Sequence, residues 1–228
     1  MQYQWNKKYN YPRSTRSLIN GSRYYSIDNE KLPSVSEILE LTKPEKDKKS
    51  LRNWREKVGE EAARQIVTES TTRGTNMHGY LENFFLNRIN GELLEKDNLA
   101  EKMANEIIEN GIKDKLTEIY GVEAVLFFPQ RFAGTCDLVG HYMGSDCIID
   151  FKNSRSPKKI EWINTMFLQL SGYAMAHNKV YHTNINKGVI LMCSTNLTFQ
   201  KFEVEGKKFL KLQDEFMERV ELFYKMTS

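Results

Sequence analysis

Two carboxylates and a lysine in the second half of the chain have the types and spacing of a metal-dependent hydrolytic site. Asp137 interrupts an apolar run of strand type, and Asp150 follows the apolar residues 147–149. A carboxylate in such surroundings is costly to bury unless it is paired or binds a metal ion. Two carboxylates from neighbouring strands can converge on one hard cation, and oxygen ligands suit Mg²⁺ or Mn²⁺. The pattern therefore predicts a divalent-metal site at Asp137 and Asp150.

Lys152 lies two positions beyond Asp150, so in a strand both side chains point to the same face. The ammonium is then placed to orient an attacking water or to neutralise charge that develops on a phosphate. An ordinary ion pair at a strand end would give the same D-x-K tripeptide, so the motif alone does not decide between the two interpretations. The residues around it favour the catalytic one, and the predicted catalytic residues are Asp137, Asp150 and Lys152.

The apolar spacing around this motif predicts a mixed α/β core with an α-helical N-terminal extension. Helices are expected near residues 34–42 (capped by Ser34 or Ser36), 51–69 with a break at Gly59, 75–90 with a stop at Gly91, 97–119, 158–177 and 207–225. Strands are expected over 22–28, 122–128, 131–142, 146–151, 187–193 and 197–204, with the three runs between 122 and 151 as an antiparallel meander. Residues 1–20 are expected to form an arm, and residues 43–49 a charged linker.

Composition excludes several classes of protein. A chain of 228 residues that is 40% hydrophobic, with interspersed charges, is typical of a soluble globular protein. No apolar run approaches the roughly 20 residues that cross a bilayer, and the first residues lack the apolar stretch of a secretory signal. Cys136, Cys147 and Cys193 show no paired spacing, which argues against a disulfide framework, a zinc site or an iron–sulfur cluster and favours a reducing compartment.

The beginning of the chain is basic and aromatic. Residues 1–27 contain no acid, and their bases are Lys7, Lys8, Arg13, Arg16 and Arg23, with six interleaved Tyr and Trp residues. Basic side chains neutralise phosphates and aromatic rings stack on bases, so the segment suits single-stranded nucleic acid. A solvated basic tail is an equally weighted alternative. A mitochondrial transit peptide is less favoured, because the segment is not clearly amphipathic.

Five sequence motifs occur in the order typical of one nuclease family. They read LPSVSEIL with LRNWREKVGEEAARQI, RGTNMHGYLE at 73–82, GVEAVLF with AGTCDLVG within 121–140, IIDFKNS at 148–154 and QLSGYA at 169–174. Through them, residues 33–177 resemble the RecB-like branch of the PD-(D/E)XK nuclease superfamily, close to the phage exonucleases related to the mitochondrial genome maintenance exonuclease. The resemblance implies a restriction-endonuclease-like core, with a central mixed sheet flanked by helices. Together with the arm and hairpin that the residues predict over 1–32, this gives one expected nuclease domain over 33–228, helical to 118 and built on the sheet from 119.

The resemblance carries roles onto the matching positions. It implies one or two Mg²⁺ or Mn²⁺ ions held by Asp137, Asp150, the Phe151 backbone carbonyl and His78, with Lys152 as the catalytic lysine. It also implies that Gln169 and Tyr173 touch the DNA strand or brace the site.

The residues themselves suggest further candidates, each with a structural alternative. Glu82 shares a helix face with His78, so it would bind the metal or hold that imidazole. Glu123 would reach the metal through water or lie at a solvated strand edge. Six further residues are expected to contact DNA or, failing that, to cap local structure or face solvent: Arg73, Thr75, Ser154, Arg155, Lys158 and Lys159. His141 and His177 match no motif and are expected to be structural or surface residues.

The resemblance implies hydrolysis of single-stranded DNA from a free end, in phage DNA replication, recombination or repair and in the cytoplasm of a bacterial host. Residues 33–118 and the arm would form a passage for that end, with recombination or replication proteins as partners. Three alternatives stay open: a catalytically silent DNA-binding protein of nuclease fold, a structure-specific endonuclease, and an RNA-processing nuclease. The sequence contains no P-loop motif, so ATP hydrolysis by this chain is not expected.

Overall fold

A six-stranded mixed sheet forms the centre of the computed structural model, which describes residues 4–19, 21–87 and 98–227. Its strands follow the order β1-β5-β6-β7-β8-β9. Neighbours pair antiparallel except β1–β5 and β7–β8, which are parallel. The bounds are β1 (Gln4–Trp5), β5 (Leu116–Phe128), β6 (Phe132–Tyr142), β7 (Ser145–Ser154), β8 (Lys187–Ser194) and β9 (Phe199–Glu205). The predicted mixed α/β class and the antiparallel meander β5-β6-β7 are confirmed.

Helices cover both faces of this sheet, because its strands carry apolar residues toward each side. On one face lie α1 (Val35–Leu41), α5 (Asn164–Tyr181) and α6 (Gly206–Thr227), which share one apolar core. On the other lie α3 (Glu60–Phe85) and α4 (Leu99–Ile107), which share a second core. Within the described ranges, no helix is long and apolar enough to cross a membrane.

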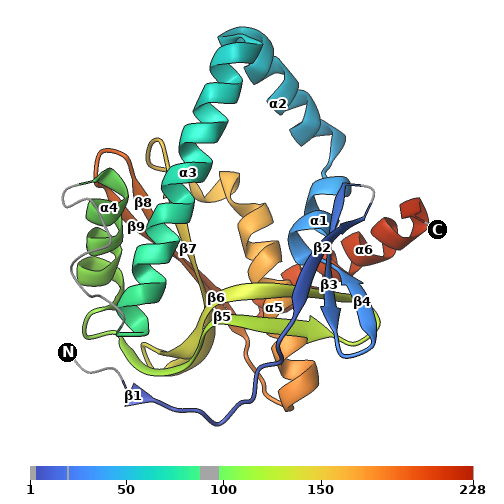
Figure 1. Ribbon diagram of the computed structural model, residues 1–228, viewed down its shortest axis with the longest axis vertical. Coiled ribbons are helices and arrows are strands. Elements are labelled where there is room, and N and C mark those ends of the chain that lie inside the picture. Colours follow the sequence, from blue (N-terminus) through green and yellow to red (C-terminus); the bar gives the residue numbers. More distant parts are fainter. Residues whose placement is uncertain (1–3, 20, 88–97, 228) are drawn as a thin grey trace.

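A small antiparallel sheet packs against one end of the central sheet (Figure 1). It consists of β2 (Thr15–Ile19), β3 (Ser22–Ile27) and β4 (Glu30–Pro33), and its buried Tyr25, Ile27 and Leu32 contact Ala133 of β6. The prediction that residues 1–20 form an arm was wrong for residues 15–19 and 4–5, which pair as β2 and β1. The burial of β2 alternates over Ser17–Ile19 between half-buried and exposed residues, as in a strand with one face exposed.

The helices α2 (Glu45–Val58) and α3 form a hairpin whose α2 arm and connecting end project away from the sheet, while the second half of α3 packs on it (Figure 1). Gly59 separates them as predicted, with a φ of +86° that favours glycine. α2 has no buried residue and touches mainly α3. The predicted linker over 43–49 was wrong beyond Pro44, because Glu45 and Asp47 place carboxylates in the first turn of a helix, where the helix dipole favours them.

α3 is continuous from Glu60 to Phe85, whereas the sequence predicted separate helices over 51–69 and 75–90. The polar run at 70–74 does not break the helix, since Ser, Thr and Arg lower helix stability only slightly. Gly74 lies in the middle of α3 because its face packs against β7: a Cβ atom there would lie 2.6 Å from Nδ2 of Asn153. The predicted helix stop at Gly91 lies outside the described residues.

Three other predicted helices are corrected or refined. A helix was expected over 97–119, but the α-helix ends at Ile107. A π-helical turn follows over Ile108–Ile112, and strand β5 begins at Leu116. The apolar residues Leu116 and Ile119 belong to β5 and the sheet core, so the sequence prediction mistook strand positions for a helical spacing. The helix expected over 158–177 starts at Asn164, after a 3-10 turn over Ile160–Trp162. α1 begins as predicted: the side chain of Ser34 caps it by accepting the N–H of Glu37 at 3.0 Å.

Candidate active site

A cleft of about 750 Å³ lies where α3 and the small sheet face the middle of α5 and the part of β6 and β7 in which these two strands no longer pair. It is lined by residues from eight elements, β2, β3, α1, α3, β5, β6, β7 and α5. The lining includes these basic, acidic and other residues: Arg16, Arg23, Tyr25, Ser70, Gly74, Thr75, His78, Glu82, Glu123, Asp137, Asp150, Lys152, Asn153, Gln169 and Tyr173. The cleft thus gathers side chains that are up to 157 positions apart in the sequence (Arg16 to Tyr173).

The cleft exists because β6 and β7 stop pairing there. The antiparallel ladder between them ends at Leu138 and Ile149. Asp137 is the next residue of β6 beyond the last pair, and its Oδ2 accepts a hydrogen bond at 2.7 Å from the backbone N–H of Phe151, which lies two residues beyond Ile149 in β7. The carboxylate thereby satisfies an N–H that the ladder no longer pairs. This holds Asp137 at the mouth of the gap between the strands.

Asp150 and Lys152 point from β7 to the α5 side of the sheet. Nζ of Lys152 lies 2.5 Å from Oδ2 of Asp150, whose side chain is only 2% exposed. Gln169 of α5 donates to Oδ1 of Asp150 at 3.4 Å and to the hydroxyl of Tyr173 at 3.0 Å. Among the described residues, Oδ2 of Asp150 has no partner in hydrogen-bond geometry, so the ammonium contact is electrostatic. A buried carboxylate oxygen without a hydrogen bond is a place where a cation fits.

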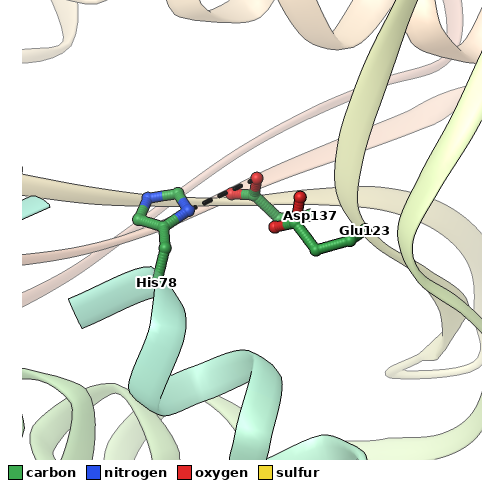
Figure 2. Close-up of side chains that lie close together, drawn as sticks. All are labelled: His78, Glu123 and Asp137. Atoms are coloured by element: carbon green, nitrogen blue, oxygen red, sulfur yellow. Dashed lines mark ion pairs between the residues drawn. The ribbon is translucent and has the colours of Figure 1, made fainter. Parts of the chain in front are cut away.

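Three potential metal ligands meet on the other side of Asp137. One ligand atom each of His78, Glu123 and Asp137 lie within 4.8 Å of one another. Figure 2 shows these side chains converging, with His78 coming from α3 and the two carboxylates from the sheet. Nδ1 of His78 lies 3.5 Å from Oδ1 of Asp137. In the described part of the chain, Glu123 rather than Asp150 completes this tight group, and Asp150 lies beside it.

Glu123 reaches this position through an unusual backbone conformation. Its φ is +48°, in the left-handed region that costs a residue with a side chain about 1 kcal/mol or more. Its neighbours in β5 pair normally, Val122 with Leu138 and Ala124 with Cys136, so Glu123 lies opposite Asp137 in the register. The local distortion turns its carboxylate into the cleft instead of along the sheet face.

The charges of this group influence one another. Burial disfavours the imidazolium of His78, but the carboxylate of Asp137 outweighs it and raises the pKa of His78 to about 9. Burial would also raise the pKa of Asp137, yet His78 lowers it overall. Burial and then the Asp137 charge raise the pKa of Glu123 to about 7, and burial raises that of Asp150 to about 6 despite Lys152. Three crowded carboxylates therefore compete for too little positive charge.

The residues present fit a divalent ion. Two ligands of one ion lie at most about 4–5 Å apart when each bond is about 2.0–2.5 Å, which the group of His78, Glu123 and Asp137 satisfies. Two carboxylates and one imidazole form a mixed oxygen and nitrogen donor set that can bind a divalent ion. A cation would also compensate the mutual repulsion of these carboxylates and of Asp150.

Most of the residues singled out from the sequence lie in the cleft. These are Thr75, His78, Glu82, Glu123, Asp137, Asp150, Lys152, Gln169 and Tyr173. The backbone of Phe151 borders the site through its N–H, while its ring is buried and stacks on Phe85 with centroids 5.9 Å apart.

Five predicted DNA contacts are not among the residues that line this cleft. Ser154 is buried and donates to the carbonyl of Ser156 at 2.9 Å. Arg73 donates from Nε to Asn153 at 3.2 Å, and both Arg73 and Arg155 line a separate cleft behind α3. Lys158 is anchored through its backbone to Gln200 of β9. Lys159 lies over the ring of Trp162, with Nζ 5.6 Å from its centroid.

Other lining residues were not identified as individual site residues. Arg16, Arg23 and Tyr25 come from the small sheet, and the run of bases without acids before Asp28 was the signal that pointed to them. Asn153 directly follows Lys152 and connects β7 to α3, because its Oδ1 accepts from Ser70 at 3.4 Å and from Arg73. His141 and His177 lie away from the cleft, as expected: His141 pairs with Asp146 at 2.7 Å, and His177 is buried.

Comparison with known proteins finds three similar proteins of one kind. The mitochondrial genome maintenance exonuclease 1 of Xenopus tropicalis is 28% identical over 177 residues, that of Mus musculus 29% over 182, and that of Homo sapiens 27% over 175. The alignments cover 71–73% of this chain but 48–51% of the relatives. The chain therefore spans about half the length of the curated relatives that it matches. No protein-family model matches the sequence.

Proposed function

We propose that this chain is a metal-dependent DNA nuclease that hydrolyses single-stranded DNA from a free end. One observation carries the proposal: Asp137, Asp150 and Lys152 meet His78 and Glu123 in one cleft. Carboxylates this close together repel one another unless a ligand compensates their charge. Metal-binding carboxylates, a histidine and a lysine are also the groups that metal-assisted hydrolysis of a phosphodiester uses. Membership of the RecB-like branch of the PD-(D/E)XK superfamily, with residues 33–228 as one nuclease domain, is part of the proposal.

The relatives support the same class of activity. They are named as exonucleases, and the similarity extends over most of this chain. The alignments include only about half of each relative. The activity and substrate proposed for this chain therefore rest also on the residues of its own cleft. A role in phage DNA metabolism within a bacterial cytoplasm belongs to the same proposal.

His78, Glu123 and Asp137 would hold a Mg²⁺ or Mn²⁺ ion, with Asp150 at its edge. When bound, such an ion lowers the pKa of a coordinated water and neutralises charge on phosphate oxygens. The Phe151 N–H fixes one oxygen of Asp137 and leaves the other facing His78. A pre-positioned carboxylate needs little rearrangement at the moment of reaction.

The remaining polar residues act on the substrate and the water. Lys152 has one carboxylate neighbour and a side chain that is 23% exposed, so its ammonium can also hold a water or a phosphate oxygen in the cleft. Gln169 braces Asp150 and is itself held by Tyr173. These contacts orient the Asp150–Lys152 pair, and no covalent intermediate with the protein is required.

The opposite wall of the cleft suits a nucleic-acid strand. Arg16 and Arg23 of the small sheet line it together with Tyr25, whose ring lies under the Arg16 guanidinium at 5.7 Å. Arginines bind phosphates, and the buried Tyr25 ring supports the Arg16 side chain from below. Action from a free end is proposed because the similar proteins are exonucleases by name.

The test is to incubate the protein with end-labelled linear and with circular single-stranded DNA, in Mg²⁺, in Mn²⁺ and in EDTA. We expect loss of the linear strand only with metal, and an intact circle. Cleavage of the circle would replace the exonuclease by an endonuclease that uses the same site. Tight binding of the linear strand without cleavage in either metal would contradict the nuclease and favour a DNA-binding protein of this fold. A matched RNA strand distinguishes an RNA-processing enzyme.

A further inference from the structure

A second cleft of about 380 Å³ lies behind α3. It is lined by Gln65, Ser70 and Arg73 of α3 together with Arg155 and Thr195 from the loops that follow β7 and β8. The sequence had placed Arg73 and Arg155 beside the catalytic residues. Their position in a separate cleft raises the question of what two arginines bind there.

α3 separates the second cleft from the catalytic cleft. At about 100° per residue, Gly74 and His78 of the catalytic cleft lie roughly 100–160° around the helix from Ala62 and Arg73. Ser70 lies between these two faces and lines both clefts. Asn153 of β7 faces Ser70 and lines the catalytic cleft, and its side chain accepts a hydrogen bond from Arg73, which lines the second cleft. The two clefts are therefore neighbours on either side of the contact between α3 and Asn153.

The second cleft carries an excess of positive charge. Arg73 uses only Nε in its contact with Asn153, which leaves its two terminal nitrogens. Arg155 is exposed and its backbone is fixed by the hydroxyl of Thr195, which donates to its carbonyl at 2.8 Å. Within the described residues, neither guanidinium has a carboxylate partner among the ion pairs. The single acid of the lining, Glu69, accepts a hydrogen bond from Gln65 at 2.8 Å.

We propose that the second cleft binds the phosphate backbone of single-stranded DNA beyond the nucleotides held in the catalytic cleft. Guanidinium groups bind phosphates through paired N–H donors and do not read the bases, so the subsite would be independent of sequence. Arg155 is its main contact and Arg73 its second. The proposal rests on the proposed function for the identity of the strand, and it predicts that affinity depends on strand length.

The test measures binding in EDTA, so that it does not depend on cleavage. Fluorescence anisotropy gives the dissociation constants of labelled strands of about 4 and about 20 nucleotides, which bracket common single-strand site sizes. The variants are Arg155→Ala and the charge-conserving Arg155→Lys. Lys208→Ala removes an exposed positive charge on α6, outside both clefts, and serves as the matched control.

We expect Arg155→Ala to weaken binding of the long strand about 3- to 10-fold and to reduce its salt slope by about one, with unchanged binding of the short strand. Arg155→Lys should recover part of the loss, and Lys208→Ala should behave as wild type. Equal losses for both lengths would place Arg155 in the catalytic site and overturn the subsite. An unchanged dissociation constant for the long strand would also overturn it. Failure of the wild type to cleave DNA would contradict the proposed function alone, since the length effect is measured without cleavage.

Discussion

The carboxylate of Asp137 accepts the backbone N–H of Phe151 at 2.7 Å, at the point where β6 and β7 stop pairing. One oxygen of Asp137 thus completes the hydrogen bonding of the sheet, and the other faces His78 at 3.5 Å. A single side chain connects the end of the ladder to the candidate metal site. Structure and chemistry at this position can be separated by two substitutions.

Asp137→Asn should abolish metal-dependent cleavage and keep the fold, because an amide oxygen still accepts the N–H of Phe151. Asp137→Ala should abolish cleavage and also lower the free energy of unfolding by about 1–3 kcal/mol relative to Asp137→Asn, since it leaves a buried N–H unpaired. Urea denaturation without metal measures the difference. Equal stability of the two variants would mean that the Phe151 contact contributes nothing to folding.

Gly74→Ala should disturb the contact between α3 and β7. The added Cβ would lie 2.6 Å from Nδ2 of Asn153, whose Oδ1 is held by Ser70 and Arg73, so Asn153 or the helix has to move. We expect cleavage to fall about tenfold or more, because a small displacement of α3 also displaces His78.

Gly79→Ala is the matched control for this helix, since nothing lies within 4 Å of its added Cβ. It should gain about 0.5–1 kcal/mol in free energy of unfolding, as expected for Gly→Ala within a helix. Thermal or urea denaturation of both variants gives the comparison. If Gly74→Ala gained as much stability as Gly79→Ala and remained active, the close packing at Asn153 would be unimportant.

Arg16→Ala and Arg23→Ala should each raise the Michaelis constant for single-stranded DNA several-fold at moderate salt, with a smaller effect on the maximal rate. Their side chains line the wall opposite the catalytic residues and would bind phosphates rather than the reacting atoms. Arg13→Ala is the control, because Arg13 is exposed and not part of the lining. Equal effects of all three variants would indicate long-range electrostatics instead of contacts in the cleft.

His177 should make stability depend on pH. It is buried, with Nε2 3.2 Å from the hydroxyl of Tyr11 and Nδ1 2.8 Å from that of Thr183. Burial lowers its pKa to about 4, although Asp146 acts in the opposite direction. The unfolded chain binds a proton near pH 6.5, and the folded chain does so only near pH 4. The unfolded state therefore holds more protons in this window, and stability falls as pH falls.

The stabilisation is fully present above about pH 6.5 and is lost toward pH 4, by up to ~3 kcal/mol for a shift of this size. Denaturant titrations between pH 4 and 7 should show this loss in the wild type and a smaller loss in His177→Gln. The difference between the two curves isolates His177 from the carboxylates that titrate in the same range. Parallel curves would mean that His177 is not buried in its neutral form.

Part of the site was predictable because strand geometry is local. The alternation of side chains places Asp150 and Lys152 on one face, and the structure has them 2.5 Å apart. The mixed sheet and the meander followed from apolar runs separated by turn residues. Helix ends were less predictable: Leu116 and Ile119 fit a helical spacing but pair in β5, because sheet pairing with β6 outweighs local preference.

The remaining parts depend on contacts between distant segments. Nothing near Glu123 in the sequence indicates a left-handed backbone, which only its position opposite Asp137 explains. Arg73 lies five residues before His78, yet the helical rotation turns it away from the catalytic cleft. Arg16 reaches the cleft because β2 pairs with β3, and no motif in the first 20 residues predicts that pairing.

The central claim is that the cleft around Asp137, Asp150 and Lys152 hydrolyses DNA with a bound divalent ion. The most direct measurement compares single-turnover cleavage of an end-labelled single strand by wild type, Asp150→Asn and Lys152→Met, over a titration of Mn²⁺ and in EDTA. Cleavage should require metal in the wild type and should fall by about 10³-fold or more in both variants, while binding of the strand in EDTA changes by less than about tenfold. Wild-type rates in either variant, or cleavage that persists in EDTA, would contradict the account.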